Sequence, residues 1–142
     1  MKLEILSFDW KLFKSDYVIS IRAMTKAWEI TVLNNHEPLI TSLIPGVLKV
    51  VYKNEAQMEN VKEFAIWRWI LEVANSSWKI LLDMLVASEN LDLEAAEKAR
   101  QEALKMMEKY KNSADQIDME NFIQAEDNLL KSIAQLKLGN IK

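Results

Sequence analysis

Side chains that could perform chemistry are few and scattered in this chain. His36 is the only histidine, and there is no cysteine. A catalytic triad or a histidine metal site needs several such groups, so both are nearly excluded, and His36 is read first as a structural residue. The missing cysteines exclude disulfides, thiolate catalysis and cysteine-ligated metals. Carboxylates and lysines are numerous, but no nucleophile-base pair, glycine-rich phosphate loop or metal-ligand spacing occurs among them. The sequence therefore predicts no catalytic residue, no metal and no cofactor.

Composition limits the class of partner. The chain has 142 residues, half of them apolar, with a formal charge of −3 and no cluster of Lys and Arg. Nucleic acid is not an expected partner, because phosphate binding needs concentrated positive charge. The longest mainly apolar runs, 64–73 and 80–87, are too short and too interrupted to span a bilayer. We expect any membrane association to be indirect, through another subunit.

The elements that must position these residues change character near residue 88. Before it, β-branched and aromatic residues form short runs between polar turns, as expected for an antiparallel sandwich. The predicted strands are Leu3 to Phe8, Tyr17 to Met24, Glu29 to Leu33, Leu39 to Ile44, Val47 to Tyr52, Met58 to Val73 and Trp78 to Val86. Polar hairpin connections are expected at 53–57 and at 75–77.

From Asp92 onward the apolar period becomes helical. Alanines and methionines recur every three or four residues up to Tyr110, and a second run extends from Phe122 to Leu136. Asp92 and Asp118 are the predicted N-caps, and Gly139 is the predicted C-terminal stop. The sequence predicts an α+β chain: residues 1–87 form a β-sandwich domain and residues 88–142 an antiparallel helical hairpin. The apolar face of the first predicted helix is rich in alanine, which buries little surface, so we expect the docking of the hairpin to be marginal.

One stretch, residues 34–46, combines two turns with a short apolar strand. Asn tolerates the left-handed region, Pro38 fixes φ, and Pro45-Gly46 suits the centre of a type II turn. The residue pattern of this stretch is His-x-Pro-Leu-Ile-Thr-x-Leu-x-Pro-Gly, followed by a Val/Leu/Lys/Val strand. This pattern resembles the signature of the epsilon subunit of F-type ATP synthases. The order of the other parts is similar over about 135 residues. Short motifs at 70–73, 81–83 and 132–136 carry this similarity.

The resemblance implies a rotor subunit of a proton- or sodium-driven ATP synthase, without catalytic residues of its own. The expected partners are the gamma subunit, the c-ring and the alpha/beta catalytic hexamer. In this family the sandwich lies at the foot of the central stalk, and the hairpin either folds down on the sandwich or extends toward the hexamer, where it restrains ATP hydrolysis. A fixed helical cap is the alternative role of the hairpin. The implied location is peripheral, on the cytoplasmic face of the plasma membrane, with an organelle-encoded origin as the other possibility.

Contact residues are carried over by the same resemblance. His36 and Thr41 correspond to positions that face gamma, and Lys26, Trp28 and Glu29 to the turn that touches the c-ring. Trp28 stands where a small residue is usual, so it is either a core residue of a rearranged turn or an exposed anchor on the ring. Trp67-Arg68-Trp69 replaces a usual Gly-Gly pair. This replacement implies straighter strands or a reshaped gamma contact.

Nucleotide binding is implied only in a weakened form. Some members hold ATP between the hairpin helices through an apolar-Asp-x-x-Arg-Ala motif and arginines of the second helix. Here Asp92 is kept, Ala95 replaces the motif arginine, and Lys131 and Gln135 stand at the second-helix positions. Alanine and glutamine cannot supply the bidentate bonds of a guanidinium, so the site is expected to be weak or lost. The alternative function is that of a non-catalytic β-sandwich adaptor, which binds another protein partner through its amphipathic hairpin.

Overall fold

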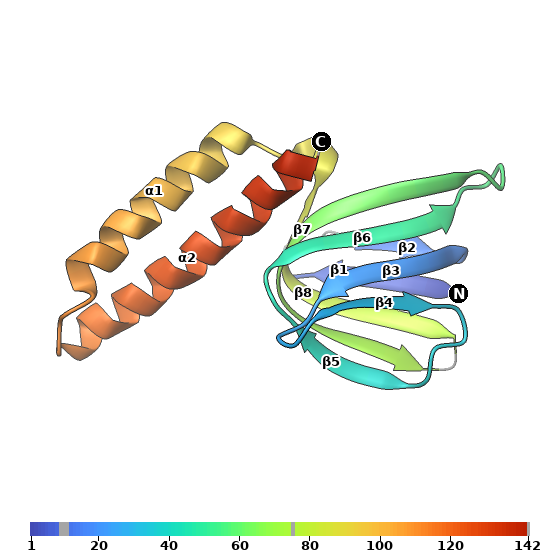
Figure 1. Ribbon diagram of the computed structural model, residues 1–142, viewed down its shortest axis with the longest axis horizontal. Helices are drawn as coiled ribbons and strands as arrows, with labels where there is room; N and C mark the ends of the chain where they lie inside the picture. The colour runs from blue at the N-terminus through green and yellow to red at the C-terminus, as the bar shows by residue number, and fades with distance from the viewer. Residues whose placement is uncertain (9–11, 75, 142) are drawn as a thin grey trace.

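The computed structural model describes residues 1–8, 12–74 and 76–141, as a strand-built body from which two helices project (Figure 1). The strands are β1 (Lys2–Ser7), β2 (Leu12–Ser15), β3 (Val18–Met24), β4 (Glu29–Leu33), β5 (Leu39–Leu43), β6 (Gly46–Lys53), β7 (Glu59–Ala74) and β8 (Ser77–Ala87). A short 3-10 turn, η1 (Ser88–Asn90), leads to α1 (Leu93–Tyr110) and α2 (Gln116–Ile141). The expected fold class, a β-sandwich followed by a two-helix hairpin, is confirmed.

The strands follow the order β2-β1-β8-β7-β6-β3-β4, and β5 pairs with β7. The pairs are antiparallel except for β1 with β8, which run parallel. These two strands lie at opposite ends of the sandwich sequence, so no short hairpin has to join them. β2 is an addition to the predicted strands, and the predicted 53–57 connection joins β6 to β7. Of the 75–77 connection, Asn75 lies outside the described residues.

The eight strands form one hydrogen-bonded array that folds over into two facing sheets, and β7 runs through both of them. Its first half pairs with β6, up to Ile66 opposite Gly46, and its second half pairs with β5, where Ser42 lies opposite Ile70. Ile66 and Leu71 are both fully buried, although residues five apart on a regular strand point to opposite faces. The strand therefore changes face between Ile66 and Leu71. Of the two predicted outcomes, straighter strands is wrong, because β7 still bends without a glycine pair (Figure 1), and a reshaped gamma contact stays a prediction. The side chains of Arg68 and Trp69 lie outside the described part.

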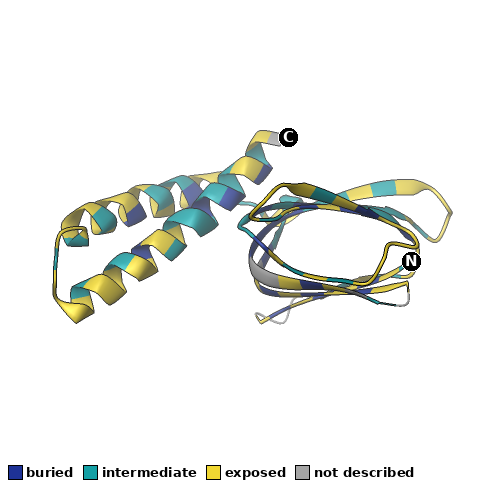
Figure 2. Cartoon of the chain, turned by 60° about the horizontal axis from the view of Figure 1, so that its bottom comes forward, coloured by how far each residue is buried: buried dark blue, intermediate teal, exposed yellow. Residues whose placement is uncertain are grey.

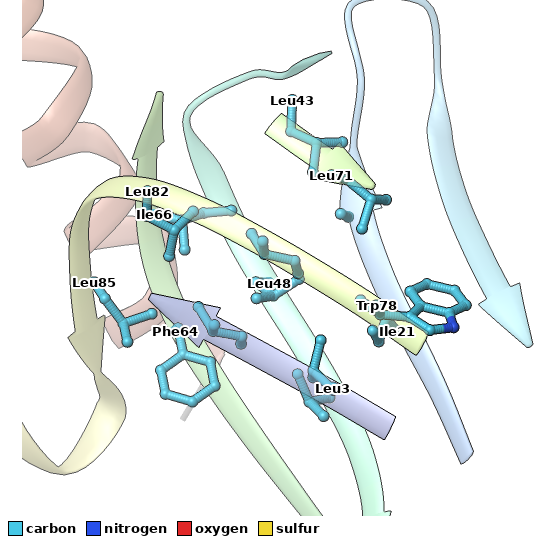
Figure 3. Packing of buried hydrophobic residues seen from close by; sticks show 14 of the residues in the cluster. Leu3, Ile21, Leu43, Leu48, Phe64, Ile66, Leu71, Trp78, Leu82 and Leu85 are labelled. Atoms are coloured by element: carbon cyan, nitrogen blue, oxygen red, sulfur yellow. The ribbon is translucent and has the colours of Figure 1, made fainter. Parts of the chain in front are cut away.

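The core fills the space between the two sheets (Figure 3). It takes side chains from most of the strands, and all of its buried members lie in the sandwich sequence. Trp78 is the largest of them. Figure 2 shows the contrast with the hairpin, where most residues are exposed and buried positions form a narrow line. The sandwich thus has a core that owes nothing to the helices.

Two turns of the 34–46 stretch differ in their outcome. Asn35 has φ 63°, so the left-handed residue predicted at the first corner is confirmed. The prediction of a type II turn at Pro45-Gly46 is wrong, because such a turn needs a positive φ at Gly46 and Gly46 has none. Gly46 instead begins β6 as an extended residue, and the Ile44 amide donates to the carbonyl of Met24 (3.0 Å). Pairing between strands, rather than a tight turn, fixes this corner.

The helix ends also differ from the sequence reading. Asp92 is the N-cap of α1, since its carboxylate accepts from the Ala95 amide at 3.0 Å, as predicted. Asp118 is not the cap of α2. The helix begins at Gln116, the Asp115 carboxylate accepts from the Ile117 amide (2.8 Å), and Asp118 accepts from the Ser113 hydroxyl (2.7 Å).

Gly139 does not stop α2, which continues to Ile141. A Cβ at this position would collide with the side chain of Leu93, at the start of α1. The glycine therefore serves close helix packing rather than termination. Among the described residues, no helix is long and apolar enough to cross a membrane.

In the described part of the chain, the hairpin meets the sandwich mainly through the second half of α2, which packs on β6 and β7 (Figure 1). Ala134 and Leu138 are fully buried against Ala65 of β7, with Val47 and Val86 at the margin. The rest of the hairpin projects to the side of the sandwich. The expectation of marginal docking stays a prediction.

Candidate functional site

The turn between β3 and β4 is fixed by one threonine. The Thr25 hydroxyl donates to the Trp28 carbonyl at 2.7 Å and accepts from the amides of Ala27 (3.2 Å) and Trp28 (3.1 Å). This holds Trp28 out in solvent, with 69 % of its surface exposed, so its reading as a core residue is wrong. Lys26 and Glu29 are exposed beside it, and Glu29 lies 3.5 Å from Arg22. The structure thus brings the three predicted ring-contact residues together on a preformed turn.

His36 and Thr41 lie on consecutive segments with different surroundings. His36 is exposed on the connection between β4 and β5, its Nδ1 donates to the Glu37 carbonyl (2.7 Å), and its ring centroid lies 6.5 Å from that of Trp78. Thr41 lies in β5 opposite the buried Leu71, so it faces inward and is partly covered. The outward residues of this strand are Ile40 and Ser42.

An exposed apolar row crosses the outer face of the sheet and was not predicted from the sequence. The pairing register places Leu12, Leu6, Leu81 and Ile70 side by side across β2, β1, β8 and β7. All four are exposed, and so is Phe8 at the end of β1. Contiguous apolar side chains on an outer sheet face are typical of a protein interface.

The neighbouring row on the same face is charged. Lys14, Glu4, Lys79 and Glu72 follow one another across the same four strands, with alternating sign. On the other side of the apolar row, a pocket of about 220 Å³ is lined by Leu6, Ser7, Phe8, Leu81 and Leu82. An apolar centre with a polar margin is the usual composition of an interface.

A sequence signal for this surface existed in two apolar runs. Ile80-Leu81-Leu82 and Ile70-Leu71 lack the alternation of a strand with one wet face. Strands buried on both faces read as continuous apolar runs. In this chain Ile80, Leu82 and Leu71 face the core, whereas Leu81 and Ile70 face outward. Apolar residues on both faces indicate that a partner covers the outer face.

A groove of about 490 Å³ lies between the two helices. Alanines from α1 form one wall, and side-chain amides of α2 form the other. It is lined by Ala95, Ala96, Ala99, Glu102, Ala103, Met106, Asn121, Gln124, Ala125, Asn128, Lys131, Ser132 and Gln135. The small residues that allow close helix approach thus leave open space where longer side chains would fill it.

The predicted nucleotide residues are only partly gathered there. Ala95, Lys131 and Gln135 line the groove, whereas the Asp92 carboxylate is used as the helix cap. Lys131 is the only cation among the residues that line the groove, and its Nζ lies 5.7 Å from the ring centroid of Trp67. Arg100 lies outside the lining and binds Glu97 (2.6 Å), which raises the pKa of the guanidinium.

The segment between sandwich and hairpin is tied to β7. Lys62 Nζ lies 3.0 Å from the carboxylate of Glu89, in η1. A hydrogen bond from its own backbone amide, followed by the bond from Lys62, lowers the pKa of Glu89. This pair holds η1 beside β7.

Comparison with known proteins gives a family match over the sandwich. The family described as "ATP synthase, Delta/Epsilon chain, beta-sandwich domain" matches residues 1–88. The ATP synthase epsilon chain of Xanthomonas campestris pv. campestris is 28 % identical over 137 residues, which cover 96 % of this chain and 90 % of the relative. That of Hydrogenovibrio crunogenus is 32 % identical over 139 residues, covering 96 % and 87 %.

Solved structures give a similar result. A chain of the Euglena gracilis mitochondrial ATP synthase, in a structure of OSCP/F1/c-ring, matches with a TM-score of 0.71 and 25 % identity, covering 98 % of this chain and 79 % of that one. A chain of the Tetrahymena thermophila mitochondrial ATP synthase, in a structure of the central stalk and c-ring, matches with a TM-score of 0.53 and 19 % identity, covering 63 % and 67 %. The second match concerns the fold alone.

Proposed function

The chain belongs to the ATP synthase delta/epsilon family, as an epsilon-type chain, and from that premise we propose that it joins the gamma subunit to the c-ring in the rotor. It is a structural and regulatory subunit of the complex, and the chemistry of ATP synthesis takes place on other subunits. The alternative of an unrelated adaptor loses its support, because the family match covers the whole sandwich.

The observation that carries the proposal is the apolar row of Leu12, Leu6, Leu81 and Ile70. A rotor subunit must transmit torque, so it needs a stable, largely apolar contact with gamma rather than a few surface ion pairs. The row supplies such a surface on rigid strands. We assign gamma to this face, extended by His36 and by Ile40 and Ser42, the outward neighbours of Thr41.

The c-ring contact is assigned to the turn of Lys26, Trp28 and Glu29. Its hydrogen bonds preform the turn, so little conformational entropy is lost on binding. Trp28 supplies an exposed aromatic anchor, and the two charges supply a polar rim. Thr25 bridges to Leu43, which places this turn at the end of the sandwich where β5 finishes.

The helical part, residues 88–142, is assigned the regulatory role. Its small contact with the sandwich suits an element that leaves that position and reaches the alpha/beta hexamer, where it would restrain ATP hydrolysis. The subunit is peripheral to a membrane-associated complex. We place it on the cytoplasmic face of the plasma membrane, in keeping with its bacterial relatives.

Cysteine cross-linking tests the placement, because the natural chain has no cysteine to remove. Glu29→Cys in an assembled, coupled complex should form a disulfide with a cysteine in the polar loop of subunit c, since contact holds the Cα atoms within about 7 Å. Glu55→Cys, on the exposed β6–β7 connection, is the matched control and should form none. Failure to cross-link from all of Lys26, Trp28 and Glu29 would contradict the placement.

A further inference from the structure

We infer that Trp67 is the latch that holds α2 on the sandwich in this chain. The inference deepens the proposed regulatory role of the hairpin and rests on it. Trp67 begins the Trp67-Arg68-Trp69 segment, in which Arg68 and Trp69 stand where the family resemblance predicts a pair of glycines. The inference assigns a function to a residue that neither the gamma face nor the c-ring turn uses.

Trp67 points away from the sandwich core. Ile66, beside it in β7, belongs to the core cluster, whereas Ala65 and Trp67 alternate with it and face outward. An outward residue earlier on the same strand, Val61, is 53 % exposed. Trp67 is only 3 % exposed, although it is the larger side chain. The cover at this point of β7 comes from α2, the helix that packs on β6 and β7.

Lys131 completes the contact from the helix side. Its ammonium lies 5.7 Å from the ring centroid of Trp67, within the range of a cation–π interaction. One and two turns further along α2, Ala134 and Leu138 pack on Ala65. Among the described side chains of β7, Trp67 is thus the large one that meets the helix.

The cation of the latch is also the cation of the groove between the helices. Lys131 is the only positive side chain among the groove-lining residues, and here it is occupied with Trp67. The two sites therefore share a residue. Closing the latch withdraws the charge that a groove ligand would use.

The test is the distance between the two parts in the full chain. Nitroxide labels on Lys53→Cys and Lys105→Cys, both exposed positions, report the hairpin position by pulsed electron paramagnetic resonance. Trp67→Ala should move the population toward undocked distances by roughly ten- to a hundredfold, because the contact loses a large buried apolar side chain. Lys131→Gln should move it by about two- to tenfold, and Lys131→Arg should restore it, since arginine also stacks on indole.

Trp28→Ala is the matched control, because it removes an exposed indole outside the contact. Distances in Trp67→Ala and Lys131→Gln equal to those in the control would overturn the latch. If Trp67→Ala fails to fold by circular dichroism, Lys131→Gln and Leu138→Ala decide in its place. ATP hydrolysis by the assembled complex separates the two proposals. A changed distance with unchanged hydrolysis supports the latch and contradicts the regulatory role.

Discussion

At the scale of single residues, helix-cap and turn chemistry was readable where a short motif determines it. Asp92 caps α1 and Asn35 takes the left-handed conformation, because each needs only its own side chain and a neighbouring amide. Asp118 was misassigned because Asp115, three residues earlier, is an equally good cap, and sequence alone does not rank the two. Trp28 could not be assigned, since its exposure depends on the hydrogen bonds of Thr25.

The residue-scale prediction concerns ATP. Ala95 and Gln135 each lack a guanidinium, and hydrogen bonds to charged groups contribute roughly 1.5 to 3 kcal/mol each. Two such losses weaken binding by about two to four powers of ten relative to a dedicated micromolar sensor. Isothermal titration of the full chain should therefore show no saturable binding at low micromolar ATP.

The converse variant sharpens that test. Ala95→Arg with Gln135→Arg places two guanidinium groups at the groove and should recover measurable binding of ATP. Leu104→Arg with Ile117→Arg, which adds the same two charges at exposed positions outside the groove lining, should not. A low micromolar dissociation constant in the unmodified chain would show that other residues have rebuilt the site.

At the scale of elements, the periodicities located the strands and helices but not their irregularities. β3 carries a register shift between Val18 and Ser20, which moves the wet face relative to simple alternation. β7 changes sheet between Trp67 and Leu71 with no glycine to signal it. Both features depend on which strands lie alongside, and a single segment does not contain that information.

Gly139 provides an element-scale prediction. Glycine inside a helix normally costs about 0.5 to 1 kcal/mol relative to alanine, so Gly139→Ala would ordinarily stabilise α2. Here the new Cβ meets Leu93, so we expect the gain to be absent in the natural background and to appear with Leu93→Ala. A double-mutant cycle from urea unfolding measures this coupling. Equal gains in both backgrounds would show that Leu93 does not restrict the site.

The Lys62–Glu89 pair predicts a dependence on pH. The pKa of the Glu89 carboxyl is lowered in the folded chain. The pair therefore contributes stability above the ordinary carboxyl pKa near 4.5, and this contribution is lost as pH falls through the pKa of folded Glu89. The pair is partly exposed and screened, so the effect should be about 0.5 kcal/mol or less. Glu89→Gln should remove that part of the acid sensitivity, whereas Glu55→Gln, an exposed residue on the β6–β7 connection, should not. Identical acid-unfolding curves for Glu89→Gln and the natural chain would show that the Lys62–Glu89 pair does not contribute to stability.

At the scale of the whole molecule, the sequence predicted the two parts but not the way they meet. The core cluster needs no helical residue, whereas the hairpin buries mostly alanines. We therefore expect residues 1–90 to keep a cooperative, strand-rich fold and residues 88–142 to be only partly helical in isolation. Circular dichroism and thermal melts of the two fragments measure this. A mainly helical or unfolded N-terminal fragment would contradict a self-sufficient sandwich.

The gamma face gives the last prediction. Ile70 and Val61 lie on the same strand, both point outward, and their exposed fractions are 54 % and 53 %. They differ in their neighbours, since Ile70 continues the row of Leu81 and Leu6, and Val61 lies outside it. Ile70→Lys should weaken assembly with gamma by at least tenfold, because a charge is then buried without a partner in an apolar contact.

Val61→Lys adds the same charge on the same strand and should leave assembly unchanged. Both substitutions are at exposed positions, so neither should shift the unfolding midpoint of the isolated chain by more than the equivalent of about 0.5 kcal/mol. Affinity for purified gamma, measured by calorimetry, separates the two variants. Equal weakening by both would mean that gamma responds to the charge of the chain rather than to this row. Weakening by Val61→Lys alone would move the gamma contact to the opposite sheet, where α2 docks.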